Sequence, residues 1–155
     1  MFYDVFRLIR HPEYFLDNDY INADVAVVRL IWPLVFSRIV QPIPLVDFRV
    51  EAGNRVMVGA LLEMRVKLLL ACSVFTDSYN KFALLWIHRN IIPAWVTPEM
   101  VCLLPDHPNR GVCGGPIEFN GHVVGIACWT LRPCGSGPSV YVRVSEHYQW
   151  ISENV

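Results

Sequence analysis

A cluster of three glycines and a proline around one cysteine, at Gly111–Pro116, constrains this chain more than any other stretch. Glycine tolerates positive φ and lets another backbone approach closely, and proline fixes the exit from the turn. The main-chain N–H groups of such a turn are open to a substrate or an anion. We therefore expect a tight turn that displays Cys113 and its own backbone donors; a hairpin loop around a buried cysteine is the alternative.

Short apolar runs separated by turn residues predict a chain built mainly of β-strands. Asn120-Gly121 suits the paired positive φ angles of a type I′ hairpin. Ser145, followed by Glu146, is expected to begin a C-terminal helix, and the apolar spacing within 76–89 is typical of a short helix. The runs that we interpret as strands are 5–9, 25–30, 55–62 and 65–70.

The composition excludes several classes of protein. A chain of 155 residues suffices for one ordinary domain. With 13 basic and 14 acidic residues, the chain has almost no net charge and therefore no overall electrostatic attraction for nucleic acid or an anionic membrane. We expect neither as a partner. The apolar stretch 68–75 is far short of the about 20 residues that span a bilayer.

Several motifs follow one another in a fixed order along the chain. The turn at 111–116 is similar to the phrase Gly-Asp-Ser-Gly-Gly-Pro, and 100–102 is similar to the strand that leads to it. Residues 124–129 are similar to Gly-Ile-Val-Ser-Trp, and 138–144 to Pro-Gly-Val-Tyr. Residues 22–30 are similar to a strand that carries a triad aspartate. Together these motifs resemble the chymotrypsin-like or trypsin-like serine proteases.

This resemblance implies an all-β fold, the chymotrypsin-like double β-barrel, with the second barrel largely present, the first mostly missing, and a C-terminal α-helix. The whole of 1–155 would be a partial trypsin-like peptidase domain. Its expected parts are the last strands of the first barrel at 1–32, an inter-barrel linker at 33–54, the second barrel at 55–144 and the helix at 145–155.

The resemblance also implies where catalytic groups would stand. Asp24 and Cys113 occupy two of the three triad positions, with Cys113 in place of the serine. The backbone N–H groups of Gly111 and Cys113 match the oxyanion hole. Val112 replaces the aspartate that, in the family, pairs with the new N-terminus on activation. We therefore expect the activation switch to be lost.

No histidine of this sequence falls at the family's general-base position, which precedes the His-Pro-x-Tyr phrase seen here at 11–14. His11 within that phrase is expected to be a solvated loop residue, and His122 an exposed residue beside its hairpin. A cysteine nucleophile also needs a base or a cationic neighbour to form its thiolate.

The expected substrate pocket departs from the family as well. His107 lies six positions before Cys113, where trypsin-like members carry an aspartate. Thr130 and Ser139 replace pocket glycines, and Trp129 matches the pocket tryptophan. These changes predict a pocket that is narrower and lacks the negative charge.

The chain has five cysteines, an odd number that leaves at least one thiol over unless it pairs between chains. Cys72 with Cys102 is one possible disulfide. The family's partner of Cys134 is Asn109 here, so Cys134 would pair with Cys128, its nearest neighbour in sequence, or stay free.

These features favour a non-catalytic serine protease homologue that binds a protein or peptide and needs no metal or cofactor. An endopeptidase that uses Cys113, with its histidine lost through an incomplete chain, is one alternative. An unstable fragment without independent function is another. The resemblance implies an extracellular protein, although residues 1–7 lack the features of a signal peptide.

Overall fold

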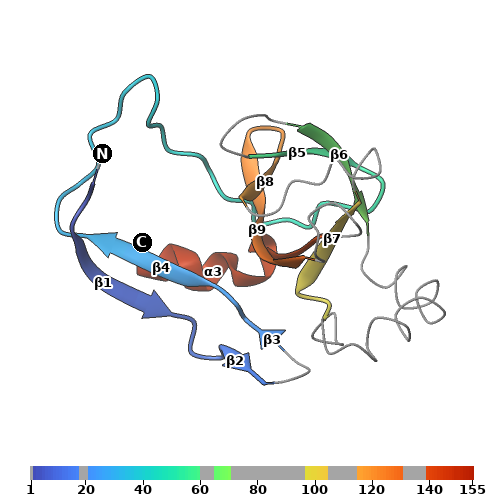
Figure 1. Ribbon diagram of the computed structural model, residues 1–155, viewed down its shortest axis with the longest axis horizontal. Helices are drawn as coiled ribbons and strands as arrows, with labels where there is room; N and C mark the ends of the chain where they lie inside the picture. Colours follow the sequence, from blue (N-terminus) through green and yellow to red (C-terminus); the bar gives the residue numbers. More distant parts are fainter. Residues whose placement is uncertain (1, 18–20, 60–64, 71–96, 105–114, 131–138) are drawn as a thin grey trace.

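The computed structural model describes residues 2–17, 21–59, 65–70, 97–104, 115–130 and 139–155. Its largest unit is a closed antiparallel β-barrel with the strand order β10-β7-β6-β5-β8-β9 (Figure 1). The strands of this barrel are β5 (Arg55–Val58), β6 (Arg65–Leu70), β7 (Met100–Leu104), β8 (Pro116–Phe119), β9 (His122–Thr130) and β10 (Ser139–Arg143).

The barrel encloses a core of branched aliphatic side chains around one tyrosine. In β5 the buried Val56 and Val58 are separated by a half-buried Met57, as expected for alternate residues of a strand. Four of the five residues of β10 are buried, because the barrel covers one face and other segments cover the second. The buried barrel cluster includes Val56, Val58, Val101, Leu103, Ile117, Val123, Val124, Tyr141 and Val142.

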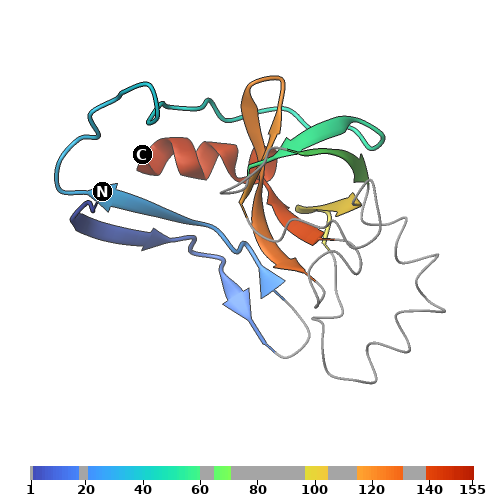
Figure 2. The same cartoon turned by 45° about the horizontal axis from the view of Figure 1, so that its top comes forward.

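Two small sheets precede the barrel in sequence. β1 (Val5–Arg10) pairs with β4 (Ala26–Leu30), and β2 (Phe15–Leu16) pairs with β3 (Ile21–Asn22), both antiparallel. The C-terminal helix α3 (Val144–Asn154) lies alongside β4 in both views (Figures 1 and 2).

The core of the barrel continues into this N-terminal region. Val25 and Val27 belong to the same buried cluster as Val144 and Ile151 of α3. Each buried aliphatic side chain contributes about 1.5–3 kcal/mol relative to an exposed one. The shared core therefore holds the β1–β4 sheet against α3 and the barrel.

The opposite face of the β1–β4 sheet is apolar and exposed. Phe6 and Leu8 of β1 are 69% and 70% exposed, and Val28, which pairs with Leu8, is 52% exposed. Alternation along the two strands explains the arrangement, because their other face supplies Ile9 and Val27 to the core.

The long connection between β4 and β5 is fixed to the barrel near its middle. The backbone N–H of Val123 donates to the carbonyl of Pro44 at 2.9 Å, and Leu45 forms a β-bridge with Val123. Val46 and Val50 are buried in the shared core. The connection thus packs on β9 rather than crossing free of the barrel.

The end of the glycine-rich turn requires glycine for two physical reasons. Gly115 has φ +79°, and a Cβ at this residue would lie 1.8 Å from the carbonyl oxygen of Gly59. The N–H of Gly59 in turn donates to the carbonyl of Pro116 at 2.9 Å. Residues 111–114, which include Cys113, lie outside the described part of the chain.

Most of the expected strands agree with the structure. Strands at 5–10, 26–30 and 65–70 confirm three of the runs, and the run at 55–62 is a strand as far as Val58. The hairpin is confirmed, with φ 51° at Asn120 and 81° at Gly121. The helix expected within 76–89 lies outside the described residues.

The structure differs from three local expectations, which concern the first residue of the C-terminal helix, His11 and His122. The C-terminal helix begins at Val144, with Arg143 as its N-cap, because β10 runs directly into it and Ser145 is already inside its first turn. His11 is 8% exposed rather than solvated, since Trp150 and His147 of α3 pack on its ring. His122, expected to be exposed, is half-buried beside its hairpin.

We predict that Gly115→Ala lowers the free energy of unfolding by more than about 3 kcal/mol, because its methyl group would enter the backbone of Gly59. Gly53→Ala is the matched control: Gly53 also has positive φ, +95°, but open space around its Cβ position. The control should cost only the about 1–2 kcal/mol of left-handed backbone strain. Urea unfolding measures both, and equal losses would contradict the close approach.

Candidate functional site

Asp24 stands at the entrance to β4 on a constrained piece of backbone. Ala23 before it has φ 45°, an uncommon value for a residue with a side chain, and is 4% exposed. The N–H of Val25 donates to the carbonyl of Ala23 at 2.7 Å, and the carbonyl of Val25 accepts from the N–H of His11 at 3.1 Å. These main-chain bonds of Val25 constrain the backbone at Asp24.

The carboxylate of Asp24 is hydrogen-bonded to a thiol of β9. The Sγ of Cys128 donates to Oδ2 of Asp24 at 3.3 Å, across 104 positions of sequence. Burial raises the pKa of Cys128 to about 12, and the charge of Asp24 and its hydrogen bond to the thiol add to the effect. Cys128 is therefore held as a protonated hydrogen-bond donor.

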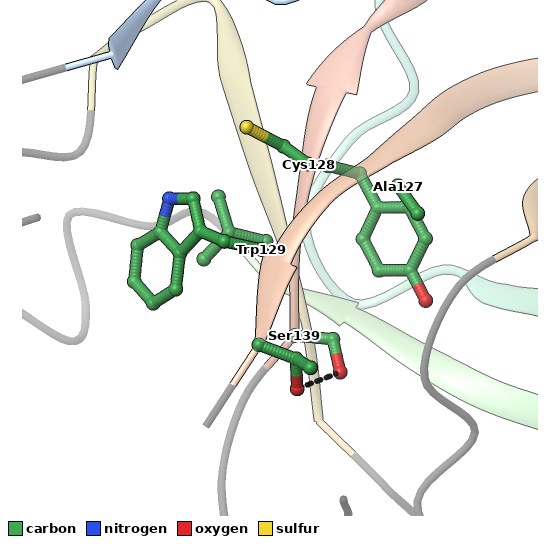
Figure 3. A pocket seen from close by; sticks show the side chains of 7 residues that line it. Ala127, Cys128, Trp129 and Ser139 are labelled. Carbon is green, nitrogen blue, oxygen red and sulfur yellow. Dashed lines mark hydrogen bonds between the residues drawn. The ribbon is translucent and has the colours of Figure 1, made fainter. Parts of the chain in front are cut away.

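A small cavity of about 100 Å³ lies beside this pair. It is formed where β9 and β10 pair near the ends of both strands (Figure 3). Its lining residues are Ala127, Cys128, Trp129, Thr130, Ser139, Val140 and Tyr141.

A hydrogen bond between two hydroxyl groups crosses one end of this cavity. Oγ1 of Thr130 and Oγ of Ser139 are 3.0 Å apart, and the two residues are direct partners in the β9–β10 ladder. In Figure 3 the dashed line marks this bond at Ser139, while the sulfur of Cys128 lies away from it. Burial raises the pKa of Tyr141 to about 12, so its hydroxyl remains neutral. The cavity wall thus presents neutral, hydrogen-bonding groups.

One edge of β9 is unpaired beside the cavity within the described part of the chain. β8 pairs with β9 only as far as Ile126, opposite Pro116, whereas β10 pairs with β9 as far as Thr130. Within the described ranges, no strand pairs with 127–129 on the side away from β10. An extended peptide can add to such an edge as a further strand.

The structure brings together five of the residues proposed from sequence: Asp24, Cys128, Trp129, Thr130 and Ser139. Sequence reasoning expected Cys128 to be a disulfide candidate and missed its bond to Asp24. The signal was its position in the pocket strand, next to Trp129. Tyr141 and Ala127 were also missed, because their place in the cavity depends on the β9–β10 register.

The cysteines divide between two states. Cys128 is a free thiol, so the expected Cys128–Cys134 disulfide is not formed. Cys102, 1% exposed in β7, is disulfide-bonded, and its pairing with Cys72 stays a prediction. The other proposed site residues, Gly111, Cys113, His107, Cys72 and Cys134, lie outside the described residues.

Within the described ranges, no group of three or more His, Cys, Asp or Glu side chains is arranged to bind a metal ion. In the same ranges no helix has both the length and the hydrophobicity needed to cross a membrane.

Comparison with known proteins identifies relatives of the whole chain. Residues 2–151 match the family model described as Trypsin. The chain is 27% identical to Kallikrein-11 of Mus musculus over 156 residues, which cover 92% of this chain and 55% of that protein. It is 27% identical to Trypsin-4 of Rattus norvegicus over 172 residues, covering 99% of this chain and 64% of the relative. The chain thus spans 55–64% of the length of these relatives.

Two solved structures share the fold. Neuropsin, a serine protease expressed in the limbic system of mouse brain, superimposes with a TM-score of 0.77 at 20% identity, covering 98% of this chain and 71% of that one. Kallikrein-related peptidase 10 in complex with Zn²⁺ gives a TM-score of 0.77 at 22% identity, covering 98% and 72%. The expected chymotrypsin-like fold, mostly β with a C-terminal helix, is confirmed.

We predict that Cys128 reacts about a thousandfold more slowly with iodoacetamide at about pH 8 in the native chain than in the unfolded chain, because its pKa of about 12 suppresses the thiolate. Asp24→Asn should raise the native rate by removing the carboxylate charge, yet leave it below the unfolded rate, since burial remains. Mass spectrometry of the Cys128 peptide measures the rates. Equal rates in native and unfolded wild type would contradict the buried acid–thiol contact.

Proposed function

The chain belongs to the trypsin family, and on that premise we propose that it binds an extended peptide segment of a protein along β9 without hydrolysing it. The proposal makes the chain a degenerate protease homologue whose pocket serves recognition. The extracellular location and the protein partner implied by the sequence resemblance are parts of the same proposal.

The observation that carries the proposal is the partner of Asp24. In this family the triad aspartate orients an imidazole, fixes its tautomer and stabilises its protonated form. Within the described residues, Oδ2 of Asp24 accepts a hydrogen bond from the thiol of Cys128, and no imidazole is hydrogen-bonded to this carboxylate. A thiol with a pKa near 12 cannot serve as a general base at neutral pH.

The described histidines are engaged elsewhere. His11 and His147 form a ring contact with each other, and Nδ1 of His122 lies 2.9 Å from the carbonyl of Asn120. None of these three is hydrogen-bonded to Asp24 in the part of the chain that the structure describes. A cysteine nucleophile at Cys113 would need a base or a cationic neighbour to form its thiolate, and none of these three histidines is held by Asp24 to act as that base.

The cavity supports recognition of a small or apolar side chain. Its volume is about 100 Å³, its walls are neutral, and the bond between Thr130 and Ser139 closes one end. A buried cationic side chain would find no carboxylate among the lining residues. A peptide strand added to 127–129 would gain main-chain hydrogen bonds and place one side chain at the cavity.

Peptide binding provides the first test. In isothermal titration calorimetry with short blocked peptides, we expect a peptide bearing Ala or Val to bind at least about tenfold more tightly than the same peptide bearing Arg. Thr130→Gly should reduce this preference by opening the cavity. Ser152→Gly, an exposed change on α3 outside the site, is the control and should leave the preference intact. Tighter binding of the Arg peptide to wild type would contradict the proposed pocket.

Turnover provides the second test and separates the proposal from a Cys113 endopeptidase. Stoichiometric protein and a bound peptide should give no cleavage product by intact-mass analysis over hours, because no base activates the nucleophile. Cys113→Ala should behave like wild type. Cleavage that disappears in Cys113→Ala would overturn the proposal in favour of the enzyme.

A further inference from the structure

Two buried imidazoles face each other where the N-terminal strands meet the C-terminal helix. His11 follows β1 directly and His147 lies in α3; they are 8% and 5% exposed. Their ring centroids are 5.0 Å apart at an interplanar angle of 74°. The indole of Trp150 covers His11 with a centroid distance of 4.6 Å. Positive charge on both rings at this distance, shielded from water, would be strongly unfavourable.

The hydrogen bonds around His11 require its neutral form. Its Nδ1 accepts from the backbone N–H of Glu13 at 3.2 Å, so this nitrogen carries no proton. The backbone N–H of His11 donates to the carbonyl of Val25 at 3.1 Å. This bond joins the loop between β1 and β2 to the residue that precedes β4. A proton on Nδ1 of His11 would point at the N–H of Glu13, so the hydrogen bond between them would be lost.

Charged groups surround His147 from three elements. Nε2 of His147 lies 3.8 Å from Oε2 of Glu99, beyond hydrogen-bond length. Glu146 on α3 is paired with Arg49 at 2.7 Å, and Glu13 approaches from the loop after β1. Burial lowers the pKa of His147 from its ordinary value of 6.5, and His11 lowers it further. The carboxylates of Glu99, Glu146 and Glu13 oppose this shift without reversing it.

We propose that the His11–His147 contact is a pH-sensitive latch that docks the β1–β4 sheet on α3 while His147 is neutral and loosens it when His147 takes up a proton. Asp24 precedes Val25, the residue that His11 holds, so the latch also controls where the carboxylate of Asp24 lies. The latch does not depend on peptide binding.

The direction of the effect follows from the pKa of His147. A histidine whose pKa is lowered in the docked state takes up its proton more readily in the undocked state. The β1–β4 sheet is therefore docked on α3 most stably above about pH 6.5, and the stability of docking falls as the pH falls below that value.

Hydrogen–deuterium exchange of the full chain tests the latch, with rates corrected for intrinsic exchange. Between about pH 7.5 and about pH 5.5, protection of residues 5–10 and 26–30 should fall by up to about tenfold, the limit set by a histidine that takes up its proton with the ordinary pKa of about 6.5 only in the undocked state. Protection of the β8–β9 hairpin at 116–126 should change less than about twofold, because its hydrogen bonds belong to the barrel ladder and not to the docked sheet.

His147→Phe keeps a ring against His11 but cannot be protonated, so its loss of protection should shrink to less than about twofold. His11→Phe keeps a ring against Trp150 and should reduce the loss only in part, because burial still lowers the pKa of His147. His122→Gln, which removes the other described histidine, is the matched control and should retain the full tenfold loss. A full loss in His147→Phe, or an equal loss in the hairpin of wild type, would overturn the latch; wild type and His147→Phe suffice to decide it.

Discussion

A single hydrophobic cluster joins the N-terminal strands, the barrel and the C-terminal helix, and the remaining features depend on it. Val25 and Val27 lie in this cluster with Val144 and Ile151. Since the strands are anchored by these contacts, Asp24 is carried against Cys128 and His11 against His147. Loss of this packing would separate both polar pairs at once.

The buried setting of the site changes its chemistry. The half-buried carboxylate of Asp24 accepts a hydrogen bond from Cys128. The same surroundings suppress the thiolate, so this contact gives structural order rather than a nucleophile. Across the cavity, the bond between Thr130 and Ser139 also occupies polar groups with each other. These pairings favour binding of a compact side chain over acid–base chemistry.

Local patterns in the sequence predicted the strands and the hairpin because their causes are local. Alternating burial in β5 and positive φ at Asn120 and Gly121 follow from neighbouring residues. The glycine-rich turn was also a sound prediction at Gly115, where the carbonyl of Gly59 leaves no room for a Cβ.

Contacts between distant segments explain what sequence reasoning missed. The sequence around His11, next to Pro12, predicts an exposed loop residue, and the packing of α3 is what buries this side chain. Cys128 resembles a disulfide candidate until β4 brings Asp24 to it across 104 positions. The strand-to-helix junction at Arg143 likewise depends on how β10 lies in the barrel.

A crystal structure of the full chain with an uncleaved peptide would test the central claim most directly. We expect Sγ of Cys128 within hydrogen-bond distance of Asp24, no imidazole between Asp24 and Cys113, and the peptide extended along 127–129. An imidazole in contact with both Asp24 and Cys113 would contradict the account, because it would supply the base that a working protease requires.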